Sequence, residues 1–148
     1  MAKMVKVGMA DLNICHSPDA ITSLGLGSCV GVALYDKNTK TAGLVHVMLP
    51  DSTKVRQNQN RAKFADTGID YLIELLEKEG AKKSSLTAKI AGGAQMFAFS
   101  SSNDMLRVGE RNVEAVKDKL KKLGIRVLAE DTGLNYGRTV EFYPETGD

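Results

Sequence analysis

One cysteine of the chain, Cys29, stands where a thiol can act as a nucleophile. It ends the run Gly25-Leu26-Gly27-Ser28-Cys29, in which a glycine-flanked loop meets an apolar stretch typical of a buried strand. Glycines let a substrate approach the main chain closely, so we expect backbone N–H groups at Gly27 and Ser28 to stabilise an oxyanion when a carbonyl is attacked. A free cysteine is commonly just a small buried hydrophobic residue, and this string alone leaves both interpretations open.

A nucleophilic thiol needs a neighbouring base, and His46 is the candidate. The apolar runs that contain Cys29 and His46 flank a short polar turn and predict a β-hairpin. A two-residue loop at Lys37-Asn38 would place the two residues directly opposite each other, and a loop centred one residue later would make them diagonal neighbours. Both registers put them on one face of the sheet, roughly 5–8 Å apart at Cβ, whereas a loop of odd length would separate them. A histidine satisfied within the core is the alternative interpretation.

The second cysteine and histidine, Cys15 and His16, form a weaker pair. Neighbouring residues of a strand point to opposite faces, so we interpret Cys15 as buried structure and His16 as a turn residue. Neither a CxxC nor an HxxxH spacing occurs in the sequence, so we expect no metal site. The chemistry proposed for Cys29 requires no cofactor either.

Hydrophobic periodicity predicts two helices among about six strands. One helix follows the apolar stripe from Phe64 to a C-cap glycine at Gly80, and the other ends at Gly124. Predicted strands lie around residues 12–14, 29–35, 43–49, 86–90, 125–129 and 140–142. We therefore expect an α+β fold, an α/β sandwich with mixed β-sheets, β-hairpins and two main helices, in a single domain over residues 1–148.

The composition excludes several classes of function. A net charge of +2, from 20 basic and 18 acidic residues, provides no footprint for nucleic acid or an anionic membrane. No apolar run approaches the roughly 18 residues of a membrane helix, so we expect no insertion into a bilayer. Two cysteines without a secretory signal indicate free thiols in a reducing cytoplasm.

A short apolar patch follows the doublet Gly92-Gly93. It contains Met96, Phe97 and Phe99 in a region without strand or helix periodicity. Packing into the core is one interpretation, and docking of a partner protein is the other.

A series of strings that spans nearly the whole chain carries a resemblance to a known family. The strings are Leu24-Gly25-Leu26-Gly27-Ser28-Cys29-Val30, His46-Val47-Met48-Leu49-Pro50-Asp51, Ala88-Lys89-Ile90-Ala91-Gly92-Gly93-Ala94, Arg111-Asn112-Val113 and Ala129-Glu130-Asp131-Thr132-Gly133. On these strings the sequence resembles the CheD family, the chemoreceptor glutamine deamidases of bacterial chemotaxis.

The resemblance implies a cysteine–histidine hydrolase whose catalytic residues are Cys29 and His46. The third catalytic residue of the family is usually a threonine six positions before the cysteine, and this chain has Ser23 there. A serine hydroxyl can still orient the imidazole, although it is less stiff at χ1 than threonine. Thr22 is a second candidate if the local register differs.

The resemblance also implies substrate, partner and fold. Family members convert receptor glutamines to glutamates with release of ammonia, here through a thioester on Cys29. Some members also hydrolyse receptor methyl esters, and many bind the phosphatase CheC. The alternative function is a non-catalytic regulatory partner of CheC. The implied fold is that of the cytotoxic necrotizing factor toxins, and a further strand usually follows the turn at residues 145–147, so an edge of the sheet is expected to be missing or replaced.

Overall fold

The computed structural model describes residues 3–26, 29–49, 60–94, 108–133 and 138–148. In chain order the elements are β1 (Met4–Val7), β2 (Leu12–His16), β3 (Ala20–Leu26), β4 (Val30–Asp36), β5 (Thr41–Val47), the single turn η2 (Arg61–Lys63), α1 (Ala65–Lys78), the single turn η3 (Lys83–Ser85), β6 (Leu86–Gly92), α2 (Val108–Leu123), β7 (Arg126–Thr132) and β8 (Arg138–Phe142).

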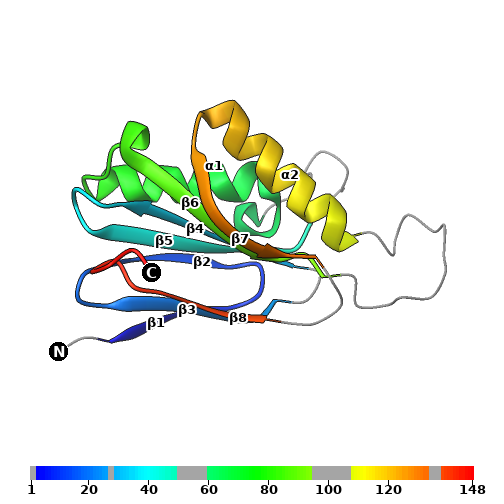
Figure 1. Cartoon of the computed structure of the whole chain (residues 1–148), viewed down its shortest axis with the longest axis horizontal. Coiled ribbons are helices and arrows are strands. Elements are labelled where there is room, and N and C mark those ends of the chain that lie inside the picture. The colour runs from blue at the N-terminus through cyan, green and yellow to red at the C-terminus, as the bar shows by residue number, and fades with distance from the viewer. Residues whose placement is uncertain (1–2, 27–28, 50–59, 95–107, 134–137) are drawn as a thin grey trace.

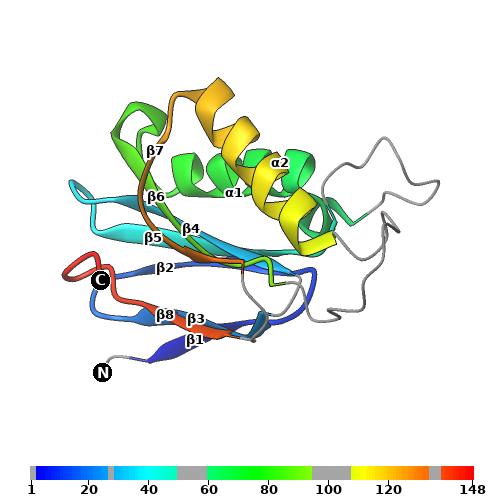
Figure 2. The same ribbon diagram turned by 45° about the vertical axis from the view of Figure 1, so that its right-hand side comes forward.

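These elements form three layers, with the two helices above a large sheet and a small sheet below it (Figure 1). The large sheet has five strands in the order β2-β5-β4-β6-β7, and the small sheet has three in the order β1-β3-β8. Figure 2 shows both helices on one face of the large sheet and the small sheet on its other face. Each sheet is mixed, because β6–β7 and β1–β3 pair in parallel while the remaining neighbours are antiparallel.

The hairpin of β4 and β5 lies at the centre of the molecule and is covered on both sides. Every residue of β5 is buried, and Tyr35 is the one residue of β4 that is partly exposed. Val45 and Val47 pack into the core under the helices, while Leu44 packs into the core between the sheets. The alternation of a strand therefore directs His46 toward the small sheet.

Two hydrophobic cores hold the layers together. The larger core lies between the helices and the large sheet, where Leu72 and Leu76 of α1 and Leu120 of α2 are fully buried. The smaller core lies between the two sheets and contains Ile21 and Phe142. The site described below is built in this second core, so its polar groups are surrounded by apolar side chains.

Both helices end as the sequence predicts. Gly80 follows α1 with φ +97°, and Gly124 follows α2 with φ +74°. Only glycine adopts this left-handed conformation without strain.

The predicted fold class is confirmed in its coarse form, with two helices, mixed sheets and a central hairpin. Within the described ranges, neither α1 nor α2 combines the length and the apolar character that crossing a bilayer requires.

The sequence analysis missed two strands, β1 and β3, which build most of the small sheet. A β-bulge interrupts the pairing of β3 with β8 between Ser23 and Leu26, and Gly25 has φ +70° there. In a regular strand Ser23 and Leu26 would point to opposite faces, because they are three residues apart. The extra residue of the bulge lets both side chains be buried. The bulge thus removes the period of two on which strand prediction depends, and the segment resembled a glycine-rich loop.

Candidate active site

The hairpin adopts the second of the two predicted registers. Val30 pairs with Val47 and Gly31 pairs with His46, around a turn at Lys37–Lys40. Cys29 directly precedes β4 and lies two residues before Gly31, so His46 is its diagonal neighbour. Diagonal neighbours share a face of the sheet.

That face is the one turned toward the small sheet. A Cβ atom built on Gly31 would lie 3.0 Å from Leu26 Cδ1 of β3, so this face of β4 meets the small sheet. Cys29 lies in the bend before β4 and is 8% exposed, while His46 is fully buried. Extending the alternation of β4 back to Cys29 would direct its thiol to the side of His46.

Ser23 joins His46 to the small sheet. Its Oγ lies 2.8 Å from Nδ1 of His46 and also donates a hydrogen bond of 2.8 Å to the carbonyl oxygen of Val7. A hydroxyl has one proton, and a carbonyl can only accept. Ser23 therefore donates to Val7 and accepts from the imidazole, which fixes the proton of His46 on Nδ1.

The other ring nitrogen of His46, Nε2, is left with its lone pair. It is buried and has no hydrogen-bond partner within the described ranges. Burial also lowers the pKa of His46 below the ordinary histidine value, because a charged ring would lose its hydration. His46 is thus a neutral imidazole with a vacant acceptor at Nε2, as a general base must be.

The thiol of Cys29 is likewise neutral at rest. Burial raises its pKa, and a contact with its own backbone N–H partly lowers it. The structure thus favours an uncharged thiol and an uncharged imidazole over a preformed thiolate–imidazolium pair.

The main chain of Cys29 is held by the end of β6. Gly93 N–H donates a 2.8 Å hydrogen bond to the carbonyl oxygen of Cys29. Gly92 has φ +105°, and a Cβ atom there would lie 2.2 Å from that same oxygen, so only glycine fits. The contact of this doublet with Cys29 was not predicted from the sequence, although two glycines at the end of a buried strand signal a close approach of chains.

Cys15 and His16 differ in burial as predicted, although His16 is the last residue of β2, paired with Thr41, and not a turn residue. Cys15 is buried, while His16 is exposed and its Nδ1 is 3.1 Å from the Thr41 hydroxyl. Cys15 pairs with Ala42, four residues from His46 along β5, or about 13 Å at the rise of a strand. Burial, assisted by the charge of Asp19, raises the pKa of Cys15 to about 11.

Thr22, the second candidate for the orienting hydroxyl, has another partner. Its Oγ1 donates a 2.6 Å hydrogen bond to the carbonyl oxygen of Val140 in β8. Ser23 is therefore the residue of the two that contacts His46.

Two groups of residues predicted from the sequence fall outside the described ranges. They are Gly27 and Ser28, predicted to line the oxyanion site, and the apolar patch of Met96, Phe97 and Phe99, predicted either to pack into the core or to bind a partner.

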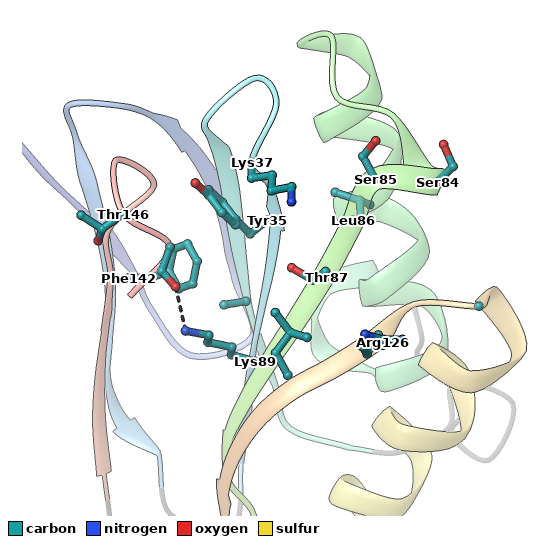
Figure 3. A pocket seen from close by; sticks show the side chains of 14 residues that line it. Tyr35, Lys37, Ser84, Ser85, Leu86, Thr87, Lys89, Arg126, Phe142 and Thr146 are labelled. Atoms are coloured by element: carbon teal, nitrogen blue, oxygen red, sulfur yellow. Dashed lines mark hydrogen bonds between the residues drawn. The ribbon is translucent and has the colours of Figure 1, made fainter.

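A cavity of about 510 Å³ opens at the opposite end of β4 (Figure 3). Its lining includes Tyr35, Lys89, Arg126 and Phe142 but neither cysteine nor histidine. Tyr35 is six residues from Cys29, about 20 Å along the strand. This cavity is therefore separate from the Cys29–His46 pair. Over the ranges that the structure describes, no group of three histidine, cysteine or acidic residues is arranged to hold a metal ion.

Comparison with known proteins shows which family this sequence matches. Residues 48–148 match the model of the family described as CheD chemotactic sensory transduction. A probable chemoreceptor glutamine deamidase CheD of Lachnoclostridium phytofermentans is 69% identical over 148 residues, which is 100% of this chain and 92% of that protein. The chemoreceptor glutamine deamidases CheD of Halalkalibacterium halodurans and Bacillus subtilis are 60% and 51% identical, over 99% and 98% of this chain and 91% and 88% of their own lengths.

The buried imidazole predicts how stability depends on pH. An unfolded histidine takes up a proton near pH 6.5, whereas His46, with its lowered pKa, does so only at lower pH. Between these two pKa values the unfolded chain binds more protons, so the free energy of unfolding should fall as the pH drops below about 6.5. Urea denaturation at a series of pH values measures this.

One variant separates His46 from other groups that titrate. His46→Gln should have a flatter pH dependence than the parent protein, because it removes the buried imidazole. An unchanged slope in His46→Gln would refute the assignment.

Proposed function

The chain belongs to the CheD family of chemotaxis proteins, and we propose that it is a chemoreceptor glutamine deamidase with Cys29 as nucleophile and His46 as base. Its substrates are glutamine side chains of the receptors, which it converts to glutamate. The observation that carries the residue assignment is the hydrogen bond between Ser23 and Nδ1 of His46. It leaves Nε2 as a vacant acceptor on the sheet face that Cys29 shares.

In the first half of the reaction the enzyme is acylated. Nε2 of His46 takes the proton from the Cys29 thiol while Sγ attacks the carbonyl carbon of the glutamine amide. The carbonyl oxygen becomes an oxyanion, and the imidazolium then gives its proton to the amide nitrogen. The carbon–nitrogen bond breaks, ammonia leaves, and a thioester on Cys29 remains.

In the second half water replaces ammonia. His46 takes a proton from a water molecule, whose oxygen attacks the thioester carbon. The carbon–sulfur bond breaks, the thiolate recovers a proton from the imidazolium, and glutamate is released. His46 therefore alternates between base and acid, and Ser23 holds its Nδ1 proton throughout.

We propose that in both steps the oxyanion lies against the main chain that directly precedes β4. Backbone N–H groups at Gly27, Ser28 and Cys29 are the proposed donors. The support in the described residues is local: the N–H of Cys29 already lowers the pKa of its own thiol, so this amide is oriented toward negative charge at the nucleophile.

The proposal also includes a protein partner and a second substrate. From the family resemblance we infer that CheC is a partner, and from the apolar character of the stretch we infer that Met96 and Phe97 form part of the contact. Hydrolysis of receptor methyl esters is inferred in the same way. It would use the same steps, with methanol leaving in place of ammonia.

The remaining inferences concern the whole chain. We infer that residues 1–148 act as one deamidase domain in the cytoplasm. The two-sheet core with the thiol and the imidazole on one hairpin supports a fold of the cytotoxic necrotizing factor type.

Loss of either member of the pair should abolish catalysis. Cys29→Ala and His46→Ala should release no ammonia from a purified receptor fragment, because each removes a group that every turnover needs. Cys15→Ala should remain active, since Cys15 is remote from His46. Circular dichroism checks that the variants are folded.

The same assay separates the enzyme from the alternative function. A folded Cys29→Ala variant that still releases ammonia would refute Cys29 as the nucleophile, whereas a parent protein that binds CheC but releases no ammonia would favour a purely regulatory partner.

The role of Ser23 predicts graded effects. Ser23→Ala removes one neutral hydrogen bond to His46, worth about 0.5–1.5 kcal/mol, so turnover should fall roughly tenfold. Ser23→Thr keeps the hydroxyl and should be tolerated or slightly faster. Thr22→Ala is the matched control, because it removes a buried hydroxyl one residue away that bonds to Val140. It should change turnover little, and a crippled Thr22→Ala beside an active Ser23→Ala would contradict the geometry.

A further inference from the structure

A buried arginine lies at the same end of the sandwich as Cys29. Arg138 is the first residue of β8 and pairs with Leu26 across the small sheet. Its side chain is only 5% exposed. The guanidinium reaches the large sheet, where Nη1 donates to the carbonyl oxygen of Gly92 at 3.4 Å and Nε is 3.3 Å from Asp131 Oδ1.

Through Gly92 and Gly93, these contacts connect Arg138 with the main chain of Cys29. Gly92 ends β6, pairs with Val30 of β4 and fits against the carbonyl oxygen of Cys29 only because it lacks a Cβ. The next residue, Gly93, donates its N–H to that oxygen. A shift of the Gly92-Gly93 turn would therefore shift the main chain of Cys29.

An arginine at this position points to a role beyond packing, because burying its charge costs folding free energy. A charge removed from water destabilises the fold unless it is paired, and the paired carboxylate, Asp131, remains 66% exposed. An apolar side chain could join two sheets without this cost. The planar guanidinium can instead span a carboxylate and a carbonyl with fixed geometry.

We propose that Arg138 is a positioning residue for the reaction, holding the Gly92-Gly93 turn so that the main chain of Cys29 keeps the thiol beside Nε2 of His46. Arg138 contacts no reacting atom in this scheme and acts through the turn. The role in turnover rests on the proposed function, whereas the effect on the thiol itself does not.

The test compares two basic residues that tie the sheets together. Arg138→Met removes the guanidinium while keeping an apolar chain. Arg138→Lys keeps the charge but loses the planar group that contacts Asp131 and Gly92 at once. The matched control is Lys89→Met, because Lys89 of β6 also donates to a carbonyl oxygen across the sandwich, that of Gly147 at 2.7 Å. Asp131→Asn removes the ionic partner and leaves the contact with Gly92 intact.

Two rates are measured in a Cys15→Ala background, so that Cys29 is the sole thiol. The first is alkylation of Cys29 by iodoacetamide over a range of pH, which needs no receptor. The second is ammonia release from a receptor fragment, separated into kcat and KM.

Arg138→Met should lower kcat by about 10- to 100-fold with little change in KM, as expected for a misplaced reacting group, and should alter the pH profile of alkylation. Arg138→Lys and Asp131→Asn should lie between this variant and the parent. Lys89→Met should lower the melting temperature but leave both rates unchanged.

If Arg138→Met matches Lys89→Met in both rates within about twofold, the arginine is only structural and the proposal is wrong. If Arg138→Met does not fold, Arg138→Lys and Asp131→Asn decide, and parent-like rates in both overturn the proposal. A parent protein that releases no ammonia would refute the deamidase function, while the alkylation profiles would still test Arg138.

Discussion

The hydrogen bond between Ser23 and His46 connects the two sheets at the proposed active site. The hydroxyl comes from β3 of the small sheet, and the imidazole comes from β5 of the large one. Because Ser23 also donates to Val7 of β1, three strands determine which nitrogen of His46 has the proton. The orientation of the base is thus a property of the sandwich as a whole, and any change in how the sheets pack reaches Nε2.

Burial between the sheets has opposite effects on the two reacting groups. It raises the pKa of Cys29 and lowers that of His46, because each neutral form is favoured away from water. A thiolate is the stronger nucleophile, so the resting pair is less reactive than a preformed ion pair. In the proposed reaction the proton therefore passes from the thiol to the imidazole as the thiol attacks the amide.

The sequence alone predicted the hairpin of β4 and β5, which contains His46 and follows directly on Cys29, because its two apolar runs and polar turn are continuous in the chain. It also predicted both helix ends from Gly80 and Gly124. It did not predict β3, since the bulge at Gly25 breaks the alternation and the buried Ser23 lacks an apolar side chain. Neither could it predict the contact of Arg138 with Gly92, which depends on how β8 meets β6 across the sandwich. Family resemblance, and not periodicity, led to Ser23.

Ser23 stands where the CheD family usually has threonine, and its two hydrogen bonds take over the role of threonine's χ1 preference. Threonine restricts χ1 through its branched Cβ, which holds a hydroxyl in place before any partner is bound. In this chain the fully buried Ser23 hydroxyl has two partners, Val7 and His46, each at 2.8 Å. Rotation about χ1 would break both hydrogen bonds inside an apolar core, where unpaired polar groups are costly. The two bonds therefore supply the rigidity that the missing methyl group would have given.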